Sequence, residues 1–162
     1  MANDIDIRSA VPADVQQIAK LAGALVRDHH AADPERFFLP EQVEEGYAWW
    51  LARELSNQHA ALQVAESAAG VVGYAYGALR ERDWNMLIDT HAMLHDVFVA
   101  PEARRAGVGR KLLLATLTAL AKLGAPRVVL STRHGNASAE RLFASLGFRP
   151  TMQEMMRASG DA

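Results

Sequence analysis

The chain contains 162 residues, carries a formal net charge of −2 at pH 7 and lacks cysteine. This length predicts one domain, residues 1–162, large enough to bury a substantial core. The missing cysteines exclude disulfides, cysteine–zinc sites and thiol nucleophiles, and the small net charge predicts no general attraction to nucleic acid or membranes. The polar N-terminal residues do not resemble a signal peptide and no apolar run could span a membrane, so we expect a cytoplasmic protein.

The first half of the chain predicts a strand, two helices and a hairpin. Alternation of apolar and polar residues indicates strands, whereas apolar residues every three or four positions indicate amphipathic helices. Two prolines interrupt the segment between the helices and predict a loop there. The expected elements are a strand at 4–9, a helix at 15–26, a loop at 29–40, a helix at 43–55 and strands at 61–66 and 71–79.

The second half predicts three more strands and two helices. A long fourth strand begins near Leu87 or His91 and ends at Val99. The elements expected after it are a leucine-rich helix at 112–123, a buried strand at 126–132, a short helix at 136–146 and a last strand at 148–156. This order predicts an α/β fold in which helices cover both faces of a mixed, mostly antiparallel sheet of six to seven strands.

A glycine-rich segment joins the fourth strand to the leucine-rich helix. Arg104, Gly107 and Gly109 stand there in the spacing Arg-x-x-Gly-x-Gly. Glycine lets an anion approach the backbone, and the first N–H groups of a helix are free to bind it. Basic side chains on the same turn add charge, namely Arg104, Arg105, Arg110 and Lys111. The spacing matches neither the dinucleotide fingerprint nor the P-loop. It predicts a phosphate site, with a solvated helix start as the structural alternative.

This segment resembles motif A of the GNAT superfamily of acetyl-CoA-dependent N-acyltransferases. Residues 136–148, Asn-Ala-Ser-Ala-Glu-Arg-Leu-Phe-Ala-Ser-Leu-Gly-Phe, resemble motif B of that family, and residues 5–14 resemble its first strand and helix entry. The resemblance implies acetyl-CoA as co-substrate without a metal, and a small-molecule or peptide amine as acceptor. It also implies a sheet that splays between the fourth and fifth strands.

The resemblance implies a cofactor site built from both motifs. Motif A would hold the pyrophosphate, and the splayed fourth strand and Asn136 would hold the pantetheine arm. Asn136 also suits a helix N-cap. Phe143 stands where relatives commonly carry a tyrosine general acid; phenylalanine cannot donate a proton and reads more simply as core. The expected cofactor-binding residues are Val97, Phe98, Val99, Arg104, Arg105, Ala106, Gly107, Val108, Gly109, Arg110, Asn136 and Phe143.

Acetyl transfer to an amine needs a base, because an alkylamine with a pKa of about 10.4 is protonated at pH 7. The candidate catalytic residues are Asp96 and His95. Strand alternation would place these two side chains on opposite faces. Each has a structural alternative, Asp96 as a backbone partner near the splay and His95 as a partly buried histidine. The resemblance implies that the first loop and the connection before the fourth strand shape the acceptor pocket. The expected substrate-binding residues are the aromatic side chains of these two connections, Phe37, Phe38 and Trp84.

Three function classes are compatible with these features. The first is acetyl transfer by direct attack of a primary amine in a ternary complex, since no cysteine exists to form an acyl-enzyme. The second is a non-catalytic acyl-CoA-binding module, and the third is a general phosphate binder. Motif B disfavours the third, whereas the sequence does not separate the first two. The oligomeric state is open, with a homodimer as one expectation.

Overall fold

The computed structural model describes residues 4–160. Within that range one mixed sheet contains five strands, which lie side by side in chain order. Strands β1 to β4 pair antiparallel, and β5 pairs parallel to β4. The strands are β1 (Asp6–Ser9), β2 (Ala60–Ser67), β3 (Gly70–Arg80), β4 (His91–Val99) and β5 (Val128–Leu130). The α-helices are α1 (Val15–Ala32), α2 (Val43–Glu54), α3 (Val108–Lys122) and α4 (Ala137–Ser145).

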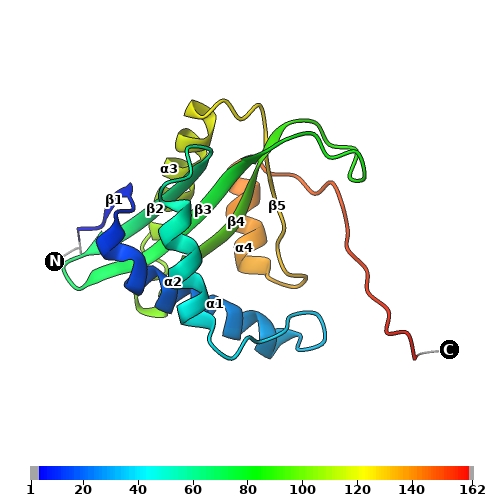
Figure 1. Ribbon diagram of the computed structural model, residues 1–162, viewed down its shortest axis with the longest axis horizontal. Helices are drawn as coiled ribbons and strands as arrows, with labels where there is room; N and C mark the ends of the chain where they lie inside the picture. The colour runs from blue at the N-terminus through cyan, green and yellow to red at the C-terminus, as the bar shows by residue number, and fades with distance from the viewer. Residues whose placement is uncertain (1–3, 161–162) are drawn as a thin grey trace.

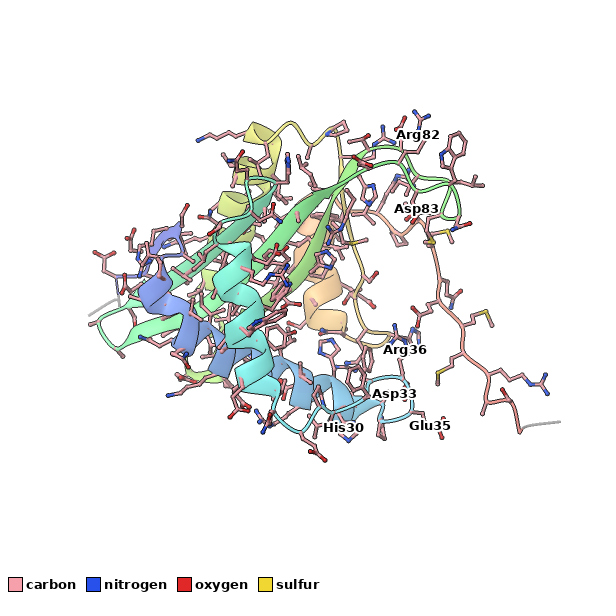
Figure 2. All side chains as sticks on the ribbon, in the orientation of Figure 1. His30, Asp33, Glu35, Arg36, Arg82 and Asp83 are labelled. Carbon is pink, nitrogen blue, oxygen red and sulfur yellow. The ribbon has the colours of Figure 1, made fainter. Side chains whose placement is uncertain are left out.

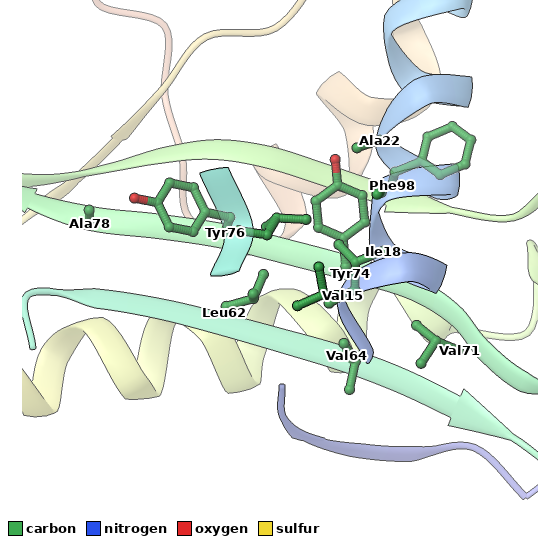
Figure 3. Close-up of a cluster of buried hydrophobic side chains, with 12 residues drawn as sticks. Val15, Ile18, Ala22, Leu62, Val64, Val71, Tyr74, Tyr76, Ala78 and Phe98 are labelled. Atoms are coloured by element: carbon green, nitrogen blue, oxygen red, sulfur yellow. The ribbon is translucent and has the colours of Figure 1, made fainter. Parts of the chain in front are cut away.

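The sheet lies between two helical layers. Helices α1 and α2 cover one face, while α3 and α4 lie behind the other (Figure 1). The larger hydrophobic cluster lies under α1 and α2, where Ile18 and Leu51 pack against Tyr74, Tyr76 and Phe98 of the strands (Figure 3). Two smaller clusters form under α3, around Leu112 and Leu120. The amphipathic helices predicted from the sequence therefore bury their apolar faces on opposite sides of the sheet.

The large cluster contains two tyrosines whose hydroxyl groups meet carboxylates. Tyr74 Oη donates a hydrogen bond to Asp96 Oδ2 at 3.0 Å, and Tyr76 Oη donates to Glu54. A buried phenol is stable when its hydroxyl finds a partner, so these bonds orient both rings. They also bring a carboxylate on β4 to the boundary of the core.

The predicted number of strands is wrong. Five strands form among residues 4–160 rather than six or seven, and residues 148–156 form no strand. Residues 149–160 extend away from the domain, with Met152 77% and Met155 86% exposed (Figure 1). A strand needs a neighbour that accepts its backbone hydrogen bonds, and sequence alternation alone does not supply one. An ion pair with Arg36 holds Glu154 of this segment, with 3.1 Å between Nη2 and Oε2.

Two boundaries also differ from expectation. Helix α1 continues to Ala32, because nothing before Pro34 breaks it, so the loop begins later than residue 29. Strand β5 contains only residues 128–130 of the predicted 126–132. The later of the two expected starts of the fourth strand, His91, is confirmed.

No helix in the described part of the chain combines the length and apolar character needed to cross a membrane. The cytoplasmic location stays a prediction.

Candidate active site

The sheet parts between β4 and β5. Their ladder contains three residue pairs and ends at Leu94 and Leu130, although β4 continues to Val99. On the side of β5, the edge of β4 beyond Leu94 therefore pairs with no strand among the described residues, and its backbone groups there are available to an extended ligand. Arg104 occupies one of them, since its Nε donates to the Val99 carbonyl oxygen at 2.8 Å. The parallel pairing of β4 and β5 ends here, at the place where the family resemblance implies a splay.

A β-bulge lies at the same point of β4. Tyr76 of β3 pairs with Asp96 and Gly77 pairs with Leu94, which leaves His95 as the extra residue. A one-residue bulge shifts the alternation of side chains along a strand. His95 and Asp96 therefore line the same cavity, and the expectation that they lie on opposite faces is wrong. Hydrophobic periodicity does not reveal the bulge.

The cavity beside Asp96 has a volume of about 420 Å³. Its walls come from the segment before α2, from α2 itself and from β3 and β4. Asp96 is half-buried at its base and accepts the hydrogen bond from Tyr74, with the Tyr47 hydroxyl as a second partner. Burial raises the pKa of the Asp96 carboxyl above 3.8, and the two hydroxyls oppose this rise. The lining residues are Pro40, Gln42, Val43, Gly46, Tyr47, Trp50, Arg80, His95 and Asp96.

His95 is held between an arginine and an aromatic ring. Arg80 Nη2 lies 3.0 Å from His95 Nε2, and the imidazole stacks on Tyr76 with 5.7 Å between the ring centroids. Arginine can only donate, so Nε2 accepts this bond and the proton of the neutral ring is on Nδ1. Loss of hydration and the Arg80 charge lower the pKa of His95 below its usual range. His95 is thus a neutral side chain whose Nε2 lone pair is already engaged.

The glycine-rich segment forms an open cradle at the start of α3. Arg105 and Gly107 have φ angles of 66° and 75°, and Gly107 is the N-cap residue of the helix. In the described part of the chain, no acceptor pairs with the amide groups of residues 105–110. A Cβ added at Gly107 would meet nothing within 4 Å, so the space in front of these amides is open. Free amides at a helix start attract phosphate, which fits the pyrophosphate expected here.

The basic side chains of this segment divide into two groups. Arg104 folds back on β4, with its guanidinium carbon 5.3 Å from the Phe98 ring centroid, and Arg110 Nη1 donates to Ser145 Oγ at 3.0 Å. Arg105 and Lys111 are exposed and form no ion pair among the described residues. Local contact to phosphate therefore fits Arg105 and Lys111 better than Arg104 and Arg110. The sequence alone does not separate these two pairs.

Three further residues expected at the cofactor have buried or half-buried side chains. Phe98 and Val108 belong to the hydrophobic clusters on opposite faces of the sheet, and Val97 packs on the cluster under α3. Because the side chains of Phe98 and Val108 are buried, a ligand at the edge of β4 or at the cradle would meet the backbone groups of these two residues. The role of these three positions in cofactor binding stays a prediction, and it would involve their main chain.

Motif B packs directly against motif A. Gly109 is close to Leu142 of α4, because a Cβ at Gly109 would lie 3.4 Å from Leu142 Cδ2. Asn136 Oδ1 accepts from the Ala139 amide at 3.4 Å, so Asn136 is the N-cap of α4. Phe143 is half-buried and lies edge-to-face on Phe148, 5.9 Å between centroids. Phe143 belongs to none of the three buried hydrophobic clusters, although its sequence context is typical of a core residue.

The aromatic residues expected to bind substrate do not line the cavity. Phe38 is 79% and Trp84 75% exposed, and Phe37 packs on His29 at 4.8 Å between centroids. The loop around Asp33 and the hairpin tip around Asp83 lie at opposite ends of one side of the molecule (Figure 2). Trp50 and Arg80, which the sequence does not single out as binding residues, do line the cavity. Tyr47 and Trp50 share a helix face, which is also the pattern of a core helix.

A larger hollow of about 610 Å³ lies elsewhere, between β2, α3 and the end of α2. Its lining includes Ser9, Glu54 and Lys122 but neither the bulge nor the glycine-rich segment. The smaller cavity adjoins both Asp96 and the splay of the sheet, so it is the candidate active site.

Comparison with known proteins agrees with this geometry. Residues 24–148 match the family model described as the acetyltransferase (GNAT) family. The chain is 34% identical over 128 residues to the mycothiol acetyltransferase of Thermobispora bispora, covering 77% of this chain and 34% of that one. It is 34% identical over 107 residues to the L-methionine sulfoximine/L-methionine sulfone acetyltransferase of Salmonella typhimurium, covering 65% and 59%. The chain thus spans about a third of the first relative and three fifths of the second.

Solved structures share the fold. The aminoglycoside N-acetyltransferase AAC(6')-Iy in complex with CoA superposes with a TM-score of 0.75 at 19% identity, covering 99% of this chain and 97% of that one. The prediction made from motifs A and B is confirmed: the chain belongs to the GNAT acetyltransferase family.

Proposed function

We propose that this protein transfers an acetyl group from acetyl-CoA to the primary amine of a small-molecule acceptor, within one domain of residues 1–162. The observation that carries the proposal is the position of Asp96. Its carboxylate lies at the base of a cavity, on the strand whose free edge begins one residue earlier. The family match supports the acetyl donor, and the relatives named above are acetyltransferases.

The residues of the chain fit a CoA-shaped ligand. The free amides of residues 105–110, with Arg105 and Lys111, suit the pyrophosphate. The unpaired edge of β4 and the start of α4 suit the pantetheine arm, which needs backbone partners. The bound co-substrate supplies a thioester carbonyl. A backbone N–H at the splay can stabilise the oxyanion there, and removal of one such donor typically costs about 10²- to 10³-fold in rate.

Asp96 is the proposed general base. One proton of the ammonium group moves to the Asp96 carboxylate, directly or through a water molecule, and frees the nitrogen lone pair. The nitrogen then forms the amide C–N bond as the thioester C–S bond breaks. It loses a second proton in this step, and the released thiolate takes up one proton to form the thiol. His95 is poorly placed for this task, because its Nε2 already accepts from Arg80. We assign His95 a positioning role.

Incubation with a panel of amines tests this proposal. We expect thiol release from acetyl-CoA that depends on the amine, with the acetylated amine identified by mass spectrometry. Binding of CoA without product from any primary amine would contradict the proposal and favour the non-catalytic acyl-CoA-binding module. That alternative rests on Phe143, which supplies no acid for the leaving thiolate.

Phe143→Tyr is expected to change kcat by less than about threefold. A thiol has a pKa of about 8.5, so its thiolate leaves readily, and we expect deprotonation of the amine to be slower. The position is half-buried, so we expect the added hydroxyl to reach solvent and to leave the melting temperature nearly unchanged. Steady-state kinetics and thermal unfolding measure both. A rise in kcat toward about 10²-fold would instead show that protonation of the leaving group limits the wild-type enzyme.

A further inference from the structure

The candidate active site contains two opposite charges that do not neutralise each other. Asp96 comes from β4 and Arg80 from the end of β3, and both line the same cavity with His95. No ion pair joins Asp96 to Arg80 among the described residues. Tyrosine hydroxyls satisfy the Asp96 carboxylate, and the His95 ring accepts one N–H of Arg80. The cavity is therefore bipolar.

Arg80 retains unused hydrogen-bonding capacity. A guanidinium has five N–H donors, and among the described residues one of those of Arg80 is paired. The charge of Arg80 acts on Glu54, but the hydrogen bonds of Glu54 come from Tyr76 and Asn57. Arg82, two residues further along, is already neutralised by Asp89 through two bonds of 3.0 Å. Arg80 thus presents a charged fork to the cavity, the arrangement that suits a carboxylate.

The remaining walls are apolar or aromatic. Tyr47 and Trp50 of α2 lie edge-to-face with 5.9 Å between centroids, and Val43 and Pro40 adjoin them. A small acceptor would place its apolar part on this side. A polycationic acceptor would bring a like charge against Arg80, which is unfavourable.

We propose that the acceptor is an amino acid with an apolar side chain, whose amine meets Asp96 and whose carboxylate is bound by Arg80. This inference rests on the proposed function and names its substrate class. The amine and carboxylate of an amino acid are separated by a single carbon, so both can be bound within one cavity. The volume of about 420 Å³ accommodates such a molecule. Arg80 is then a specificity-determining residue, since it contacts a part of the acceptor that does not react.

Matched acceptors and variants test this assignment. The probes are leucine and phenylalanine, their amides, and the corresponding amines that lack the carboxylate. We expect Arg80→Gln to lower kcat/KM for the amino acids about 10- to 100-fold, mainly through KM, because a charge-assisted pair is lost. The same variant should change kcat/KM for the amides by less than about threefold. Comparing each variant with the wild type on the same probe cancels the differences in amine pKa.

Arg82→Gln is the matched control, because it removes an equal charge from the same hairpin outside the cavity. We expect it to leave both acceptor classes unchanged, and Arg80→Lys to recover part of the loss. Calorimetric titration of leucine into the protein saturated with CoA reports binding without turnover. Arg80-dependent binding with no product would overturn the proposed function but retain this ligand class. Amides or simple amines used as well as amino acids, or an equal loss for all probes in Arg80→Gln, would overturn the inference and retain acetyl transfer.

Discussion

Gly107→Glu is expected to abolish the thermal stabilisation that CoA gives the wild-type protein. Binding to the folded state contributes about 2.7 kcal/mol at a ligand concentration of 100 Kd, which corresponds to about 5–11 °C for a domain of this size. Glutamate at position 107 would place a negative charge in the open space in front of the cradle amides. That charge repels the pyrophosphate and competes for the same N–H groups. Thermal unfolding with and without CoA measures the loss.

Gly124→Glu is the control for this variant. Gly124 follows the C-terminal end of α3, has a φ of 92° and, like Gly107, has nothing within 4 Å of an added Cβ. Both substitutions force a side chain into the left-handed region and should cost about 1–2 kcal/mol of stability. Only the substitution at position 107 should remove the response to CoA. A CoA shift retained in Gly107→Glu would locate the pyrophosphate elsewhere.

Asp96→Asn is expected to lower kcat/KM about 10²- to 10⁴-fold at neutral pH, the range for loss of a general base. Asparagine keeps the shape of the side chain and can still accept the hydrogen bond from Tyr74, but it cannot take a proton. The defect should diminish as pH rises toward the pKa of the acceptor amine, because free amine then forms without help. Rate profiles from pH 6 to 10 test this. Wild-type rates across that range would show that the base is elsewhere.

Stability measurements separate loss of the base from loss of the fold. The pKa of Asp96 is raised in the folded protein, so its contribution to stability is present below the unfolded value of 3.8 and is lost as pH rises through the folded pKa. At pH 7 the buried carboxylate therefore lowers stability, and Asp96→Asn should melt no lower than the wild type.

Tyr74→Phe removes a hydrogen bond that favours the charged carboxylate, so it should move the acid limb of the rate profile to higher pH.

Local patterns in the sequence predicted the parts of the fold that depend on neighbouring residues. Helices at 15–26 and 43–55, the hairpin of the second and third strands and the glycine-rich helix start follow from periodicity and from backbone preferences. The last strand was predicted wrongly because a local pattern does not show whether a partner strand is present. A strand was predicted over residues 148–156, but strand pairing depends on a partner edge that the sequence does not specify.

The sequence by itself determined the family, through the spacing of Arg104, Gly107 and Gly109 and the motif that starts at Asn136, and it identified Asp96 as a candidate base. Only the tertiary structure decided what surrounds that base. The bulge at His95 reverses the alternation of β4, and the folding of α2 over the sheet brings Tyr47 and Trp50 to the cavity that Arg80 also lines. These contacts join residues far apart in the chain. They depend on strand register and helix packing, which are properties of the whole core and not of any local pattern.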